Sequence, residues 1–147
     1  PGRRRVNELR RKAIGLLARR EHSRAELARK LAADGTEEDI ANVLAQLESE
    51  GLLSDARAAA AYVRAHAARF GATRLRQDLR ARGLDAEPAL DEAGELGSEL
   101  DRARAVWQKK FGISPADARE WTRQARFLQG RGFATDVIRR VLKDLDA

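Results

Sequence analysis

The sequence contains no cysteine, which excludes disulfide bonds and thiolate metal sites. Only 5% of the residues are aromatic and three are proline, while alanine supplies much of the 43% hydrophobic content. This composition favours closely packed helices over a sheet. There is no apolar run of about 18 residues and no signal-peptide pattern, so neither a membrane span nor export is predicted. We therefore expect a cytoplasmic protein without metal or cofactor.

The charge balance is basic. The chain carries 29 Lys and Arg residues against 23 Asp and Glu, a net charge of +6, and 24 of the 29 are arginines. The planar fork of arginine fits phosphates and carboxylates. A GC-rich genome also raises arginine content, so the composition has two explanations. The excess of positive charge favours a polyanion or an acidic protein as partner and does not distinguish between these two classes.

A short pattern recurs three times along the chain. A basic, helix-like run ends in a leucine that is followed four residues later by Gly35, Gly83 or Gly132, and these glycines stand 48 and 49 residues apart. The equivalent positions of the runs are Leu27, Leu75 and Gln124, then Leu31, Leu79 and Leu128. A recurrence at this period predicts stacked copies of one small helical unit.

Each copy is predicted to contain three helices. The expected fold is all-α, with three tandem three-helix, helix-turn-helix-like repeats that form an elongated, curved array. A loose basic tail is expected at 1–5, followed by repeats at 6–51, 52–97 and 98–147. The inward-facing aliphatic residue of each third helix is expected at Ile40, Ala89 and Ile138.

Capping residues mark several helix ends. Ser23 and Glu26 are expected to form a capping box, in which the serine hydroxyl accepts from the Glu26 N–H and the carboxylate returns the bond. Gly35 is expected to end that helix in the left-handed conformation. A later helix is expected to start at 114–117, with Pro115 at its first position and Asp117 in its first turn.

Basic residues gather on the second helix of each repeat and in the turn before it. Side chains four apart on a helix share a face, so such residues can meet phosphates or an acidic protein surface together. The alternative is an ordinary solvated helix face. Repetition on corresponding helices favours a continuous basic stripe. The candidate partner-binding residues are Arg19, Arg20, Arg24, Arg29, Lys30, Arg74, Arg76, Arg80, Arg82, Arg119, Arg123, Arg126 and Arg131.

No catalytic motif is present. The chain lacks a phosphate-binding glycine loop, a paired-histidine helix motif and a Gly-x-Ser-x-Gly elbow, which argues against an enzyme. His22 fits a turn position better than a metal pair or a catalytic dyad with His66. The aromatic residues of the third repeat fit a local hydrophobic core better than base stacking. They are Trp107, Phe111, Trp121, Phe127 and Phe133.

Several segments together resemble one known family. They are residues 17–27 (LARREHSRAEL), 51–55, 61–64, 75–79 with 82–83, and 127–128 with 131–133. In this order they resemble the RecX family, the bacterial regulators of the recombinase RecA, over nearly the whole chain. The resemblance implies an all-helical protein of three three-helix repeats. It also implies binding in the helical groove of the RecA–DNA filament and inhibition of filament growth, ATP hydrolysis and strand exchange.

The sequence departs from the family pattern at three places. Ala58 follows Arg57 where the family usually has phenylalanine, so an aromatic core anchor is absent there. Ala134 stands where a serine cap is usual, although Thr135 can substitute for it. Gly130 lies where a bulkier residue is commoner. These departures bear on local packing more than on function.

Two functions remain as hypotheses. The first is a monomeric, non-enzymatic regulator of homologous recombination and DNA repair that docks on the RecA filament through its arginines. Contacts with phosphates of single- or double-stranded DNA are compatible with it. The second is an independent helix-turn-helix-like DNA-binding module that acts without RecA. The second is weaker, because the candidate helices lack the Asn, Gln and Arg mixture that reads base edges, and residues 36–50 are acidic.

Overall fold

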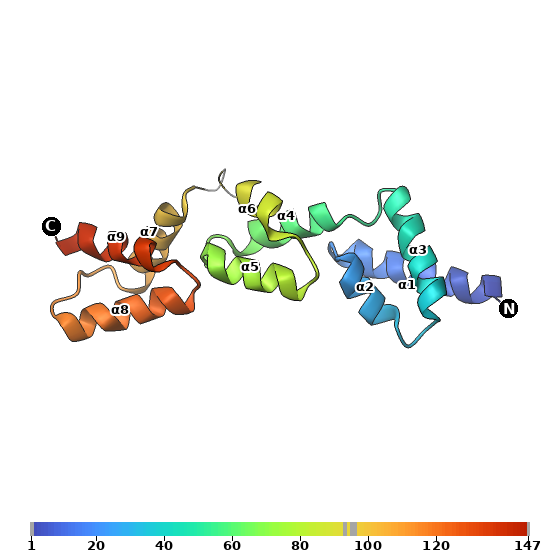
Figure 1. Ribbon diagram of the computed structural model, residues 1–147, viewed down its shortest axis with the longest axis horizontal. Coiled ribbons are helices and arrows are strands. Elements are labelled where there is room, and N and C mark those ends of the chain that lie inside the picture. The colour runs from blue at the N-terminus through green and yellow to red at the C-terminus, as the bar shows by residue number, and fades with distance from the viewer. Residues whose placement is uncertain (1, 93, 95–96, 147) are drawn as a thin grey trace. The chain divides into compact units, whose positions relative to one another are not determined.

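The computed structural model describes residues 2–92, 94 and 97–146, with side chains up to Lys143. Within this part the chain forms nine α-helices and no strand, which confirms the all-α prediction (Figure 1). The helices are α1 Gly2–Arg19, α2 Arg24–Leu31, α3 Glu37–Ser49, α4 Asp55–His66, α5 Ala72–Ala81, α6 Ala86–Glu92, α7 Glu99–Lys110, α8 Ala118–Gly130 and α9 Thr135–Asp146.

Polar side chains start several helices as predicted. The capping box of α2 is present: the Glu26 N–H donates to Ser23 Oγ at 3.0 Å, and the Ser23 N–H donates to the Glu26 carboxylate at 3.1 Å. Thr36 caps α3, and Ser98 caps α7. Each cap gives a partner to an N–H group that the helix itself leaves unpaired.

Two predicted helix starts are wrong. Residues 2–5, expected as a loose tail, form the first turn of α1. Arginine has high helix propensity, and extending an existing helix needs no new nucleus. The helix expected at 114–117 begins later, because Asp117 is its N-cap and accepts from the Glu120 N–H at 2.8 Å. The side chain of Asp117 thus decides where α8 begins, and Pro115 lies in the loop before it.

The three repeat glycines do not share one conformation. Gly83 and Gly132 have φ angles of 72° and 87°, in the left-handed region where glycine ends helices. Gly35 is not left-handed, so the prediction for it is wrong, and α2 ends earlier with Ala32 as its C-cap. Gly35 instead lies against α1, where a Cβ would come 2.8 Å from the side-chain atom Leu9 Cδ1.

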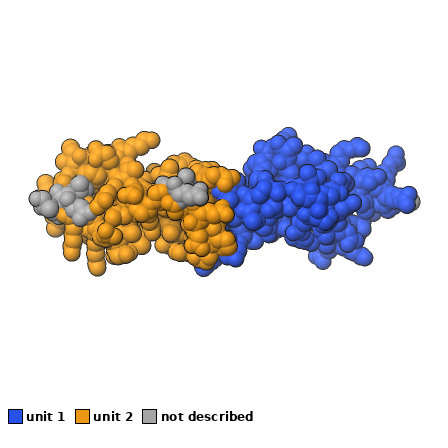
Figure 2. All heavy atoms as spheres, turned by 90° about the horizontal axis from the view of Figure 1, so that it is seen from above, with its two compact units in different colours: residues 1–61, 79–85 blue, residues 62–78, 86–147 orange. Residues whose placement is uncertain are grey.

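The chain divides into two compact units, residues 1–61 with 79–85 and residues 62–78 with 86–147 (Figure 2). In the first unit α1, α2 and α3 pack together, and in the second α7, α8 and α9 do so. The first core contains Leu9, Ala13, Leu27, Leu31, Ile40, Val43, Leu44, Leu47 and Leu53. The second contains Ala103, Trp107, Leu128, Phe133, Ile138, Val141 and Leu142.

The three repeats follow one structural register. Equivalent positions are buried alike: Leu27 with Leu75, Leu31 with Leu79 and Leu128, and Ile40 with Ala89 and Ile138. The repeat boundaries at 51 and 97 stay predictions, as does the elongated, curved arrangement. Residues 93, 95 and 96, beside the second boundary, lie outside the described part.

Gln124 is buried like the leucines at the equivalent positions, but its side chain is polar. The residue is 2% exposed. Its Oε1 accepts from Trp107 Nε1 at 2.7 Å, and its Nε2 donates to the Ile113 carbonyl at 3.0 Å. A buried amide requires hydrogen-bond partners, and the Trp107 indole and the Ile113 carbonyl supply them. Gln124 thereby joins α8 to α7 and to the loop between them.

Within the first unit, the turn after α5 packs against the start of α2. Ser23 Oγ donates to the Arg82 carbonyl at 2.6 Å. A Cβ on Gly83 would lie 2.8 Å from Ala25 Cβ, so the two segments approach as closely as glycine allows. The repeat glycine therefore sets the distance between its turn and the preceding repeat.

Within the second unit, the turn after α8 packs in the same way against the start of α5. The Gly71 N–H donates to the Arg131 carbonyl at 2.8 Å, and the Thr73 N–H donates to the Gly132 carbonyl at 3.2 Å. A Cβ on Gly132 would lie 2.2 Å from Arg74 Cβ. Gly71 and Arg131 occupy the repeat positions of Ser23 and Arg82, so the same junction is built twice.

Candidate partner-binding surface

The candidate basic residues lie on α2, α5 and α8, at the end of α1 and in the adjoining turns. Their exposure divides them into two groups. The half-buried residues are Arg24, Arg74, Arg76, Arg82 and Arg131. The exposed residues are Arg19, Arg20, Arg29, Lys30, Arg80, Arg119, Arg123 and Arg126. Hydrogen bonds, ion pairs and ring contacts within the fold divide these candidate residues further.

Arg20 supports the start of α2. Its Nη2 donates to Glu26 Oε2 at 2.9 Å, and Glu26 belongs to the capping box and is only 9% exposed. Burial raises the pKa of Glu26, but the hydrogen bonds from the Ser23 N–H and from Arg20 together outweigh burial and hold that pKa below its ordinary value. Arg20 is therefore a partner of the carboxylate that caps its own repeat.

Lys30 is also engaged within the fold. Its Nζ lies 3.0 Å from His22 Nε2, while His22 Nδ1 lies 3.0 Å from the Arg20 carbonyl. Burial lowers the pKa of His22 and outweighs the bond to that carbonyl, and the charges of Arg20 and Lys30 lower the pKa further. A neutral His22 thus donates from Nδ1 and accepts from Lys30 at Nε2. This is a role in the turn, as the sequence indicated.

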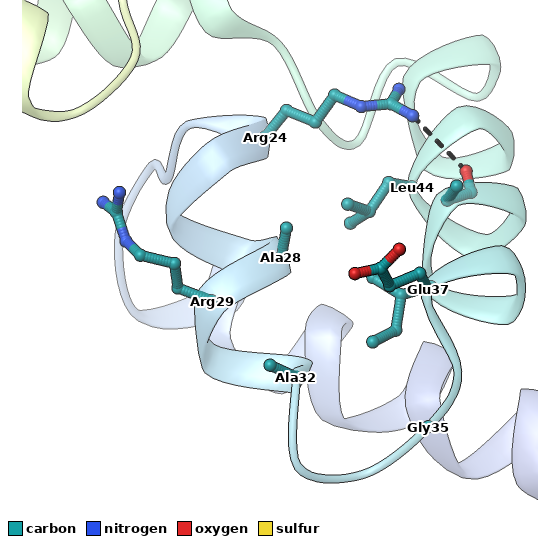
Figure 3. A pocket seen from close by; sticks show the side chains of 9 residues that line it. Arg24, Ala28, Arg29, Ala32, Gly35, Glu37 and Leu44 are labelled. Carbon is teal, nitrogen blue, oxygen red and sulfur yellow. Dashed lines mark hydrogen bonds between the residues drawn. The ribbon is translucent and has the colours of Figure 1, made fainter.

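Arg24 reaches across the groove between α2 and α3. Its guanidinium forms an ion pair with Glu48, and its Nη2 lies 3.5 Å from the Ala41 carbonyl oxygen (Figure 3). The groove has a volume of about 460 Å³. Its lining residues are Arg24, Ala28, Arg29, Ala32, Gly35, Glu37, Ile40, Ala41 and Leu44. This surface combines a largely apolar floor with a charged rim.

Three guanidinium groups surround Phe70 in the second unit. The Cζ atoms of Arg74, Arg69 and Arg131 lie 3.9, 5.4 and 5.8 Å from the ring centroid. Arg74 Nε also lies 3.9 Å from Asp78 Oδ2. A ring face attracts cations through its quadrupole, which orients the guanidinium plane while its N–H edge stays available for an anion.

Arg131 connects this group to a second set of rings. Its Cζ lies 5.1 Å from the centroid of Phe127, and Lys110 Nζ lies 5.3 Å from the same ring. Phe127 packs edge-to-face against Phe111 at 5.4 Å, and Arg123 Cζ lies 5.1 Å from Phe111. We call these residues the cation–aromatic cluster: Arg69, Phe70, Arg74, Lys110, Phe111, Arg123, Phe127 and Arg131.

The aromatic residues of the third repeat serve its core. Trp107 and Phe133 are buried in it, and Phe111, Trp121 and Phe127 are half-buried against it. The core interpretation from the sequence is therefore confirmed for this group. Three members of the cation–aromatic cluster, Arg69, Phe70 and Lys110, were not among the sequence candidates, because none of them lies on the second helix of a repeat, where the basic pattern recurs.

Two further candidates form exposed ion pairs. Arg76 Nε lies 2.9 Å from Glu87 Oε1, and Arg123 Nη2 lies 2.9 Å from Glu120 Oε1. Hydrogen bonding to Glu120 raises the pKa of Arg123, and the same bond, with one from Gln124, lowers the pKa of Glu120. Exposed pairs of this kind contribute little to stability, so an incoming anion can compete for these arginines at small cost.

Five candidates face solvent without an ion pair to any described residue: Arg19, Arg29, Arg80, Arg119 and Arg126. Arg29 and Arg126 are equivalent in the repeat register, two residues after Leu27 and Gln124. Arg82 contributes its main-chain carbonyl to the junction with α2. The unpaired arginines are the part of the predicted surface that has no structural task within the described chain.

Two charged residues that the sequence did not single out hold the second unit together. Arg102 is 9% exposed, and its guanidinium donates to the Ala67 carbonyl at 2.8 Å and to the Phe70 carbonyl at 3.3 Å. Glu99 Oε1 accepts from the Ala72 and Ala134 N–H groups at 3.3 Å each. Burial lowers the pKa of Arg102, opposed by the charge of Glu99. Both side chains bond to main-chain N–H or carbonyl groups. Because every residue has such groups, the sequence does not indicate these contacts.

The described residues contain no group of three His, Cys, Asp or Glu side chains placed to hold a metal ion. Among the same residues, no helix is long and apolar enough to span a membrane.

Three family models match consecutive parts of the chain. They describe the first, second and third three-helix domains of RecX, and they match residues 10–47, 54–89 and 98–142. Each match covers one of the three repeats recognised from the leucine and glycine spacing.

Curated proteins and solved structures agree with these matches. A protein of Leptothrix cholodnii named regulatory protein RecX is 50% identical over 92% of this chain and 87% of its own. One of Ralstonia nicotianae with the same name is 42% identical over 95% and 89%. The crystal structure of RecX from Lactobacillus salivarius superposes with a TM-score of 0.78 at 20% identity, covering 97% of both chains. The structural likeness concerns the fold.

Proposed function

The chain belongs to the RecX family of regulatory proteins, and from this premise we propose that it regulates homologous recombination and DNA repair by binding the RecA–single-stranded-DNA filament. Binding inhibits filament extension, ATP hydrolysis and strand exchange. The protein performs no chemistry itself. It acts in the cytoplasm as a monomer and favours a filament conformation that is unsuited to exchange.

The observation that carries this proposal is the set of exposed arginines without an ion pair to any described residue. Arg29 and Arg126 occupy equivalent positions on α2 and α8, and neither pairs with a described residue. An unpaired guanidinium fork is ready to bind carboxylates or phosphates, and a RecA–DNA filament presents both. Arg20, Arg24 and the other paired candidates support the fold beside this surface.

The first test is the single-stranded-DNA-dependent ATP hydrolysis of RecA, measured while this protein is added well below the RecA concentration. DNA binding by the protein alone is measured at matched salt. We expect inhibition at substoichiometric amounts, with weak binding to DNA alone. No effect on RecA together with tight DNA binding would overturn the proposal.

The second test assigns the surface. In the same assay, Arg29→Glu combined with Arg126→Glu should abolish inhibition while the circular dichroism spectrum and Tm stay unchanged. The control combines Arg11→Glu with Arg140→Glu, which changes the net charge equally at exposed positions outside the candidate set. Full inhibition by the Arg29 and Arg126 variant would show that these residues do not carry the docking.

One observation favours the alternative, an independent DNA-binding module. The cation–aromatic cluster of the second unit places Arg74 and Arg131 around Phe70, so cations that can meet phosphates lie beside an aromatic ring. Against this alternative, α3 begins with Glu37, Glu38 and Asp39, which repel a phosphate backbone. The DNA-only arm of the first test separates the two functions.

A further inference from the structure

A groove with a volume of about 300 Å³ lies between α8 and α9, in the second compact unit. Its apolar lining consists of Ile138, which is buried, and of Ala125 and Trp121, which are half-buried. Arg126 of α8 and Arg139 of α9 also line the groove, and both are exposed. A hollow of this size accepts a few side chains of a partner. We call it the α8–α9 groove.

The two arginines of the α8–α9 groove have no counter-ion in the described part of the chain. Neither Arg126 nor Arg139 forms an ion pair with a described residue, and no Asp or Glu among those residues lines the groove. Glu120, the one carboxylate of α8, pairs with Arg123 instead. Asp136 lies one turn before Arg139 on α9 and is not paired with it. The groove therefore carries a positive charge that a partner can neutralise.

The first repeat provides a matched comparison, because equivalent positions line the groove between α2 and α3. We call this one the α2–α3 groove. Where it has the carboxylate of Glu37, the α8–α9 groove has Thr135. Where it has Ala41, the α8–α9 groove has Arg139. Both differences make the α8–α9 groove the more positive of the two.

The α2–α3 groove is balanced in charge. Glu37 lines it, and Arg24 is paired with Glu48. Arg29 also belongs to its lining, but Figure 3 shows this side chain pointing away from the groove. The same position of the repeat therefore holds a balanced groove in the first unit and a positive one in the second. Preference for an anionic partner is a property of the α8–α9 groove and not of the repeat.

The apolar lining indicates which class of anionic partner fits. Ile138 and Ala125 offer aliphatic surface, and Trp121 packs against the core of the third repeat. Single strands of nucleic acid are instead bound by basic tracks with open aromatic faces. A protein segment fits both features of the groove, because an apolar side chain can cover the aliphatic surface while carboxylates meet the arginines.

Covering the apolar lining also strengthens the contacts between charges. A partner that covers Ile138 and Ala125 excludes water from beside Arg126 and Arg139. Charge-assisted hydrogen bonds are stronger in such a medium of lower dielectric constant. An ion pair at this groove is therefore worth more than an exposed pair elsewhere on the surface, where water and salt screen the attraction.

We propose that the α8–α9 groove binds a short acidic, amphipathic segment of a protein partner, with an apolar side chain on Ile138 and Ala125 and carboxylates on Arg126 and Arg139. This rests on the proposed function, because the partner that presents the segment is a RecA subunit of the filament. It adds Arg139 to the candidate binding residues and places this contact on the third repeat.

The first experiment gives the α8–α9 groove the charges of the α2–α3 groove. The variant is Thr135→Glu with Arg139→Ala, which introduces the residues of the equivalent positions in the first repeat. Glu37 is the first residue of α3, and a carboxylate in the first turn of a helix is favourable, so the variant should fold. The control is Gln108→Glu with Arg140→Ala. It changes the net charge equally, at exposed positions of the same unit that do not line the groove.

The second experiment tests the apolar lining. Ala125→Asn places a polar amide in the α8–α9 groove. Ala28→Asn makes the same change at the equivalent position of the α2–α3 groove, which is also half-buried. Both positions lie on the second helix of their repeat, so the two substitutions lower helix propensity alike. Only Ala125→Asn should weaken binding to the filament.

Binding is measured by fluorescence anisotropy on preformed RecA–single-stranded-DNA filaments and on single-stranded DNA alone, at one salt concentration. We expect Thr135→Glu with Arg139→Ala to lose about tenfold or more in filament affinity. Arg139→Ala alone, which introduces the best helix former, and Ala125→Asn should each lose about threefold or more. The controls should stay within about twofold. Circular dichroism and Tm verify that each variant is folded.

The other outcomes overturn the proposal in distinguishable ways. Unchanged filament affinity in the groove variants shows that the groove is not the site, while inhibition by the wild type leaves the proposed function standing. An equal loss in the charge control reduces the effect to net charge. Loss in the charge variants with none in Ala125→Asn refutes the apolar contact. An equal loss on DNA alone identifies nucleic acid as the occupant. Failure of the wild type to bind filaments overturns the proposed function, and this inference falls with it.

Discussion

Gln124 shows how a single residue adapts one repeat without changing its register. Leucine at the equivalent positions 27 and 75 contributes only apolar contact, whereas Gln124 accepts from the Trp107 indole and donates to the Ile113 carbonyl. The third repeat therefore replaces part of an apolar core by a buried polar network. Such a network is stabilising only while every member keeps its partner.

We predict that Gln124→Leu destabilises the protein by about 1–3 kcal/mol, although leucine is the residue of the other repeats. The substitution leaves the Trp107 N–H and the Ile113 carbonyl without this partner. Urea denaturation followed by circular dichroism measures the free energy of unfolding. Trp107→Phe should cost less when it is added to the Gln124→Leu variant than in the wild type, and strictly additive losses would refute the network.

At the scale of elements, the junction between a repeat turn and the preceding second helix is the recurring device. Gly132 approaches the start of α5 so closely that a Cβ would overlap Arg74, and Gly83 approaches Ala25 on α2. The left-handed φ of each glycine ends one helix, and its missing side chain admits another. One glycine therefore satisfies a local and a tertiary requirement at once.

We predict that Gly132→Ala lowers the free energy of unfolding by about 3 kcal/mol or more, because left-handed strain adds to overpacking against Arg74. Gly130→Ala is the matched control two residues away, in α8, where a Cβ meets nothing within 4 Å. It should stabilise by up to about 1 kcal/mol, since alanine is the better helix former. Thermal unfolding followed by circular dichroism compares the two, and equal Tm values would contradict the junction.

At the scale of the whole molecule, the protein carries an excess of positive charge. The net charge is +6, and several arginines of the candidate surface face solvent without an ion pair among the residues that the structure describes. Attraction between exposed charges is screened within about 8 Å at physiological ionic strength. Docking on an anionic filament should therefore depend on salt.

We predict that filament affinity falls steadily as NaCl is raised from about 50 to about 200 mM. The slope should be smaller for Arg29→Glu with Arg126→Glu, because fewer cations meet the partner. It should be closer to the wild-type slope for the control with Arg11→Glu and Arg140→Glu. An affinity that does not change with salt would show that the arginines do not carry the docking.

The repeat and most of its helices could be predicted from the sequence alone. The leucine and glycine spacing predicted which positions are buried, and Ser23 forms the expected capping box with Glu26. These features depend on residues within a few positions of one another, and helical periodicity records them directly in the sequence. The family resemblance rests on the same local segments.

Which cations form contacts within the fold, and which are open to a partner, depends on how the helices pack. Arg131 packs against Phe70, 61 residues earlier in the chain, and Arg24 pairs with Glu48 across a groove. Gly35 lies close to the Leu9 side chain and is not in the left-handed conformation that the sequence predicted. These contacts join residues far apart in the sequence, and their geometry exists only after the helices have packed.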